Sequence, residues 1–117
     1  MTRESRGSGL TAAELQILLT LANGALHGYG IKLDIAERTE GRMSLGSGTL
    51  YAAIQRLEQC AFLAPAQPPE GEASDPRRRY YRLEPGGEHV LRVELERMAS
   101  VVRQGRSLKL ISRTEEA

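Results

Sequence analysis

The sequence has little that would support a disulfide, a metal centre or a membrane span. It holds one cysteine and two histidines among 117 residues, and no tryptophan. One cysteine cannot form an internal disulfide, and the two histidines lie too far apart for a recognisable zinc-ligand spacing. No apolar run approaches the roughly 18 residues that a membrane helix needs. We therefore expect a cytoplasmic protein without metal or cofactor, in which Cys60 is a small buried apolar side chain.

The sequence lacks a large excess of either charge: 16 lysines and arginines and 15 acidic residues give a net charge of +1. This balance excludes a uniformly basic nucleic-acid coat protein, but it does not exclude a local basic patch. The length fits one domain and is too short for most large enzyme scaffolds. The sequence also shows no catalytic carboxylate pair, nucleophile–base pattern or phosphate-binding loop, so we do not expect an enzyme.

What is present is a pattern of helices and a hairpin. Apolar residues at helical spacing, together with caps at Thr11 and Ser47, predict four helices. Glu14 completes a capping box with Thr11, and Pro85 opens the last helix, which Gly105 is expected to end. The predicted helices cover residues 12–22, 29–39, 47–60 and 85–105. Two strands, 62–65 and 77–83, are predicted around a loop at 67–76.

This order predicts a mainly α fold with a small β-hairpin, namely a winged helix-turn-helix domain followed by a C-terminal dimerisation helix. Residues 1–9 are expected to be a flexible arm. The DNA-binding domain covers 10–84, with the recognition helix at about 47–60 and the wing at about 62–83. Residues 85–117 then form the dimerisation helix and a tail.

In such folds the second helix of the helix-turn-helix enters the DNA major groove. Ser47, Thr49 and Tyr51 would supply hydroxyl groups there, and Gln55 and Arg56 are long enough to reach a base edge. The wing carries three consecutive cations for phosphates or the minor groove: Arg77, Arg78 and Arg79.

Each of these features has a second interpretation. Tyr51 could pack half-buried against the preceding helix, and Arg56 could be a solvated surface charge. The three arginines of the wing, which lie beside Glu70, Glu72 and Asp75, could simply keep a loop soluble.

The last helix carries an apolar seam at steps of four, three and four residues, formed by Leu91, Leu95, Met98 and Val102. An exposed stripe of this kind would be a liability on a monomer, so the sequence predicts a homodimer. A two-fold dimer in turn predicts a pseudo-palindromic DNA operator, with half-sites about 34–36 Å apart if they are separated by one turn.

Three blocks carry a family resemblance: LHGYGI at 26–31, GTLYAAIQRLE at 48–58, and RYYRL at 79–83 with Gly87 following. Over residues 10–102 the chain resembles the PadR family of bacterial transcriptional regulators. The resemblance implies a winged helix-turn-helix that binds operator DNA as a homodimer, usually as a repressor. It also implies DNA contacts for Tyr29, Ser47, Thr49 and Tyr51. His27 matches the family's loop position, where a structural hydrogen bond is favoured over a ligand role.

Two points stay open. The near-neutral charge would also suit a winged-helix module that binds a protein instead of DNA. A small-molecule effector, if there is one, would fit the apolar junction between the last helix and the helix at 12–22. No aromatic residue follows Tyr81, so a drug site built on stacking in the last helix is not expected.

Overall fold

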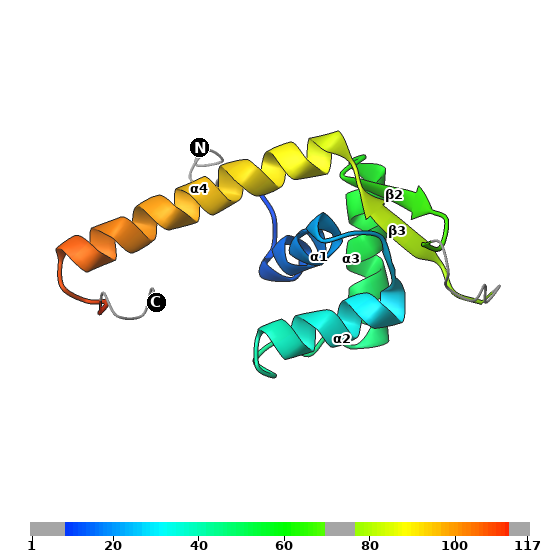
Figure 1. Ribbon diagram of the computed structural model, residues 1–117, viewed down its shortest axis with the longest axis horizontal. Helices are drawn as coiled ribbons and strands as arrows, with labels where there is room; N and C mark the ends of the chain where they lie inside the picture. The colour runs from blue at the N-terminus through cyan, green and yellow to red at the C-terminus, as the bar shows by residue number, and fades with distance from the viewer. Residues whose placement is uncertain (1–8, 70–76, 113–117) are drawn as a thin grey trace.

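The computed structural model describes residues 9–69 and 77–112, which form four helices and a three-stranded sheet (Figure 1). The mainly α architecture with a small β element is the one predicted. Three predicted segments lie largely outside the described residues: the arm except Gly9, most of the wing loop with its three acidic residues, and the end of the tail. The elements are α1 (Ala12–Ala22), β1 (Leu26–His27), α2 (Gly28–Arg38), α3 (Ser47–Gln59), β2 (Leu63–Ala66), β3 (Tyr80–Leu83) and α4 (Pro85–Ser107).

Helix α1 is the centre of the core and contacts α2, α3, α4 and β3. It starts at the predicted capping box: Glu14 N donates to Thr11 Oγ1 at 3.1 Å, and Thr11 N donates to Glu14 Oε1 at 2.9 Å. Ile17 and Leu18 are fully buried on this helix. Because α1 is apolar on most sides, the other helices can pack around it.

The sheet has the order β1-β3-β2, and both pairings are antiparallel. Leu26 of β1 pairs with Tyr81, and Leu63 of β2 pairs with Leu83. The wing prediction is corrected in two respects. A third strand, β1, joins the sheet, and β3 begins only at Tyr80, so Arg77–Arg79 precede the strand instead of forming its first half.

Two details around α3 differ from the prediction. The N-cap is Gly46, with Ser47 as the first helical residue, and no side chain caps this end. Cys60 is exposed, which corrects the expectation of a buried thiol, because it caps the C-terminus of α3 on the solvent side.

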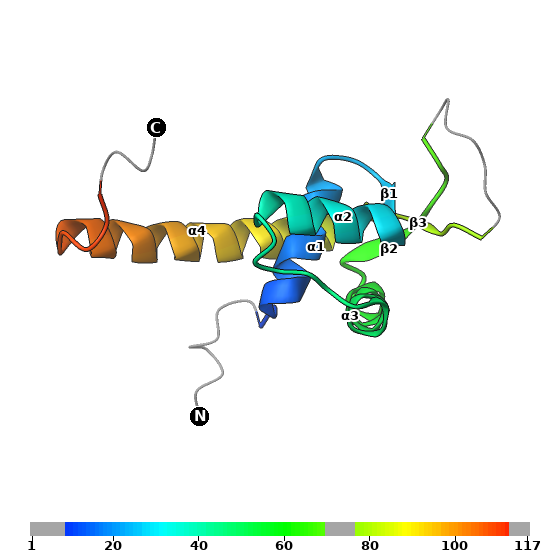
Figure 2. The ribbon, with the colours of Figure 1, turned by 90° about the horizontal axis from the view of Figure 1, so that it is seen from below.

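Helix α4 begins at Pro85 as predicted but runs through Gly105 to Ser107. A single glycine inside a helix lowers its stability by only about 1 kcal/mol, so Gly105 does not end this long helix. The first turns of α4 pack against α1, and the rest extends away from the body (Figures 1 and 2). In the described part of the chain no helix has the length and apolar character that crossing a membrane requires.

Candidate nucleic-acid interface

The first turn of α3 is open to solvent. Ser47, Gly48 and Thr49 are all exposed, and no side chain accepts a hydrogen bond from the backbone N–H groups at this end. Free N–H groups and the helix dipole together favour an anion at such a helix start. Farther along, the exposed strip consists of Ala52, Gln55 and Gln59. The alanine keeps the helix slim, while the two glutamines extend into solvent.

Tyr51 joins this strip to the start of α2. Its phenol lies so close to Gly28 that a Cβ added at that glycine would overlap the hydroxyl group. Tyr51 is nevertheless 45% exposed, and Tyr29, the neighbour of Gly28, is 57% exposed. Tyr51 therefore packs against α2, in agreement with the second interpretation, and still presents a surface to solvent beside Tyr29.

His27 caps the helix that carries Tyr29. Its Nδ1 accepts a hydrogen bond from Gly30 N at 3.0 Å, which is the structural hydrogen bond expected at this loop position. The Nε2 atom lies 3.1 Å from Nη1 of Arg78, and the ring meets Tyr80 edge-on. One side chain thus contacts both the start of α2 and the wing. The contact with the wing has no signal in the local sequence, because Arg78 and Tyr80 are about fifty residues away.

The wing brings one of its arginines, Arg79, next to α3. Arg79 lines a hollow of about 270 Å³ together with Tyr51, Gln55 and Glu58, and Ile54 and Tyr81 also form its wall. Burial raises the pKa of Tyr81, an effect that the positive charge of Arg79 opposes. Arg77 and Arg78 are exposed beyond this hollow. Glu58 is an acidic neighbour of Arg79 that the sequence reasoning missed, since no local pattern relates the two residues.

Arg82, which lies on β3, binds other groups of the protein. Its Nε donates to Glu84 Oε2 and its Nη1 to the carbonyl of Pro65, both at 2.8 Å. These bonds join β3 to β2 and to the start of α4. The basic character of the wing surface therefore comes from the arginines that precede β3.

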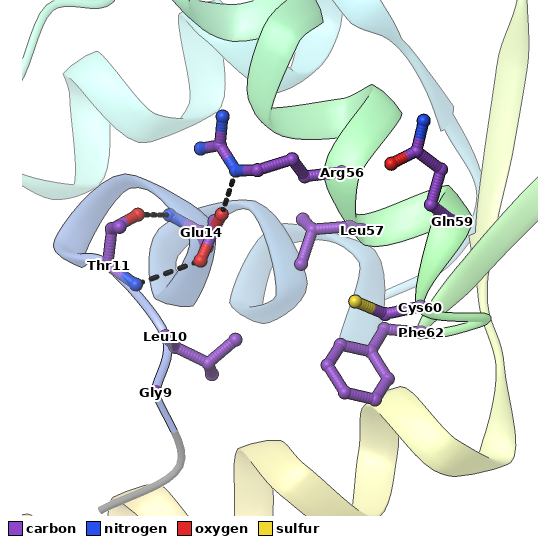
Figure 3. Close-up of a pocket in the computed structure, with 9 residues that line it drawn as sticks. All are labelled: Gly9, Leu10, Thr11, Glu14, Arg56, Leu57, Gln59, Cys60 and Phe62. Atoms are coloured by element: carbon purple, nitrogen blue, oxygen red, sulfur yellow. Dashed lines mark hydrogen bonds and ion pairs between the residues drawn. The ribbon is translucent and has the colours of Figure 1, made fainter. Parts of the chain in front are cut away.

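Arg56 lies on the opposite flank of α3. Its Nε donates to Oε2 of Glu14 at 2.8 Å, and it lines a separate hollow of about 520 Å³ between α1 and α3 (Figure 3). Apolar side chains of Leu10, Leu57 and Phe62 form much of that wall. The structure thus brings Tyr51, Gln55 and Arg79 to one hollow, and places Arg56 against α1. Tyr29 is exposed and follows Gly28, the residue against which Tyr51 packs.

The predicted seam of α4 divides into two parts. Leu91 is 4% exposed and belongs to the core of this chain, so it is not available to a partner. Leu95, Met98 and Val102 are 36–38% exposed. Leu95 still lines a hollow with Leu19 and Ala22 of α1. The C-terminal half of α4 extends beyond α1 (Figure 1).

Comparisons with known proteins agree with this architecture. The model of the PadR-like transcriptional regulator family matches residues 17–93. An uncharacterized 37.1 kDa protein in transposon TN4556 of Streptomyces fradiae is 37% identical over 87 residues, which are 74% of this chain and 23% of that protein. The chain therefore spans about a quarter of the length of this curated relative.

Two solved structures share the fold. A PadR family transcription regulator from Clostridium difficile superposes with a TM-score of 0.71 at 22% identity, over 84% of this chain and 98% of that one. Bacillus subtilis PadR in complex with operator DNA gives a TM-score of 0.60 at 22% identity, over 73% of this chain and 47% of that one. With a family match over most of its length, the chain belongs to the PadR-like family of transcriptional regulators.

Proposed function

We propose that this protein binds a double-stranded DNA operator as a homodimer and represses transcription. The observation that carries the proposal is one surface on which the open first turn of α3, Tyr51, Gln55 and Arg79 meet. In this arrangement α3 enters the major groove, where the amide of Gln55 can pair with a base edge. Ser47, Thr49 and the free backbone N–H groups bind phosphate.

The remaining contacts come from both sides of α3. Tyr29 is exposed at the start of α2, directly after the glycine against which Tyr51 packs, and we assign it to the same DNA backbone. Arg77, Arg78 and Arg79 of the wing bind phosphates or the adjacent minor groove. Bacillus subtilis PadR, which has the same fold, was solved in complex with operator DNA, and this supports operator binding by the present chain.

Dimerisation is proposed through the end of α4 that extends from the body. The helical face that buries Leu91 continues there as Leu95, Met98 and Val102. Since these side chains are only partly covered within this chain, a second copy of α4 is the partner that would remove them from water. The two recognition helices would then face a pseudo-palindromic operator.

A small-molecule effector has a candidate place at the predicted junction. A hollow of about 360 Å³ lies between α1 and α4, lined by Leu19, Ala22, Leu83, Leu91 and Leu95, with Glu88 and Arg92 at its polar part. The size is within the range of small-molecule sites. A thermal-shift screen in the presence of operator would identify a compound that binds there, and substitution of Ala22 by Phe should abolish its effect.

The test of DNA binding is a fluorescence anisotropy titration with a labelled duplex from the promoter region of the protein's own gene. We expect specific binding at 50 mM salt that weakens by roughly 10³–10⁵ at 200 mM if six to ten phosphates are contacted. An unrelated duplex serves as control. Absence of binding at low salt would contradict the proposal and favour the protein-interaction module.

A further inference from the structure

Glu14 is a buried carboxylate that serves two helices at once. It is 6% exposed, and each of its oxygens accepts a hydrogen bond. Oε1 accepts from the backbone N–H of Thr11 at 2.9 Å, and Oε2 accepts from Nε of Arg56 at 2.8 Å (Figure 3). Removing Arg56 would leave the buried carboxylate without its charged partner, which is costly in a poorly hydrated place. The carboxylate therefore ties α3 to the first turn of α1.

Because of the position of Arg56 on α3, its contact with Glu14 restrains rotation of this helix. At 3.6 residues per turn, Arg56 lies about 140° around the helix axis from Tyr51. Tyr51 is held against Gly28 of α2, and Arg56 is held against Glu14 of α1. The helix is thus fixed on both flanks, and the strip between them carries Ala52 and Gln55. These two contacts together oppose rotation of α3 about its own axis.

We propose that Arg56 is a positioning residue, which sets the orientation of the recognition helix through Glu14 and does not read a base. The inference rests on the proposed function, because orientation matters only if α3 enters a groove. A binding group works when its support holds it within about 10–20° of the required geometry. A rotation of α3 would displace Gln55 and the first turn of the helix together. It would thereby weaken the DNA contacts of these groups, although Glu14 and Arg56 make no DNA contact themselves.

The test compares Glu14→Gln and Arg56→Gln by operator titration at several salt concentrations. We expect each variant to bind about tenfold more weakly, and the double variant to bind little more weakly than either, as for two residues that act through one contact. The salt dependence should stay that of the wild type, because every phosphate contact remains. If Arg56 itself bound DNA, Glu14→Gln would keep or raise affinity by removing a negative charge, and Arg56→Gln would reduce the salt slope by about 0.9.

The matched control is Thr11→Ala. It removes the capping hydroxyl from Glu14 N but leaves the bond between Glu14 and Arg56 in place. This variant should lower the melting temperature and keep the operator affinity. Equal reductions of affinity for Thr11→Ala and Glu14→Gln would overturn the proposal, since the effect would then follow stability alone.

A second measurement does not depend on DNA. Amide hydrogen exchange in α3 of the free protein should be faster in both Glu14→Gln and Arg56→Gln than in the wild type and Thr11→Ala. Should Glu14→Gln not fold, Arg56→Gln carries the same test, because that side chain is 55% exposed. A wild type that binds no DNA would contradict the proposed function, whereas unchanged exchange in α3 would contradict the positioning role.

Discussion

At the residue scale, two neighbouring glycines at the start of α4 differ in what surrounds them. Gly87 is buried, and a Cβ there would overlap the backbone carbonyl of Phe62 and lie 2.9 Å from a methyl group of Leu83. A Cβ at Gly86 would meet only ordinary contacts, the nearest at 3.5 Å. Gly87 is thus required where α4 crosses the turn before β2, and Gly86 is not.

We predict that Gly87→Ala lowers the free energy of unfolding by about 1–3 kcal/mol, because a rigid backbone group must move. Gly86→Ala should be neutral or stabilise by up to about 1 kcal/mol, since alanine loses less entropy in a helix. Urea denaturation of both variants measures the difference. Equal stability of the two would show that α4 does not approach the turn closely at Gly87.

A polar network between α1 and α2 makes stability depend on pH. Arg38 Nε and Thr20 Oγ1 each donate to Asp34 Oδ2 at 2.7 Å. The hydrogen bond from Arg38, helped by that from Thr20, lowers the pKa of Asp34 below its ordinary value of 3.8, although partial burial opposes this. A folded-state pKa below the unfolded one means that the network stabilises the fold above pH 3.8 and stops doing so as pH falls further.

We therefore predict that Asp34→Asn melts at a lower temperature than the wild type at pH 7, and that the difference closes as pH falls below 3.8. The effect should be modest, because the side chain is 37% exposed. Glu37→Gln, which removes an exposed acid from the same helix, is the control and should change little. Thermal unfolding at pH 7, 5, 3 and 2 makes the comparison, and a gap that does not narrow between pH 5 and pH 2 would refute the explanation.

At the scale of elements, the wing and α3 form one surface although they are separate in the sequence. We predict that replacing Arg77, Arg78 and Arg79 by Ala weakens operator binding, because the wing then binds fewer phosphates. The salt slope should fall by about 0.9 for each phosphate that the wing no longer binds. The control replaces three cations of the α4 region, Arg92, Arg103 and Lys109, by Ala. If both triple variants bind alike, only net charge matters and the wing does not touch the DNA.

The elements also show where sequence reasoning succeeded. Helices α1 and α3 were predicted nearly to the residue, because a capping box and a buried stripe such as Leu50, Ile54 and Leu57 are local signals. β1 was missed because its two residues carry no strand pattern and pair only once β3 is beside them. Glycine commonly follows the last residue of a helix, so the sequence predicts that α4 ends at Gly105. The helical hydrogen bonds nevertheless continue to Ser107.

At the scale of the whole molecule, the uncovered end of α4 requires a partner in the proposed function. We predict that Leu95→Glu combined with Met98→Glu yields a monomer by sedimentation equilibrium and lowers operator affinity, because one recognition helix then binds alone. The control is Val93→Glu, on the opposite side of the helix and also exposed. A wild type that sediments as a monomer at micromolar concentration would contradict the dimer.

The sequence by itself determined the helices, the capping box, the three blocks of the family pattern and the presence of a basic wing, because each depends on residues that are near one another in the chain. Only the tertiary structure decided which of those residues act together. Gln55 and Arg56 are adjacent in sequence, yet one lies in the hollow with Arg79 and the other is bound to Glu14. Leu91 and Leu95 share one helical face, yet only the first is buried in the core. Helical periodicity specifies a face, and packing against distant elements specifies what that face meets.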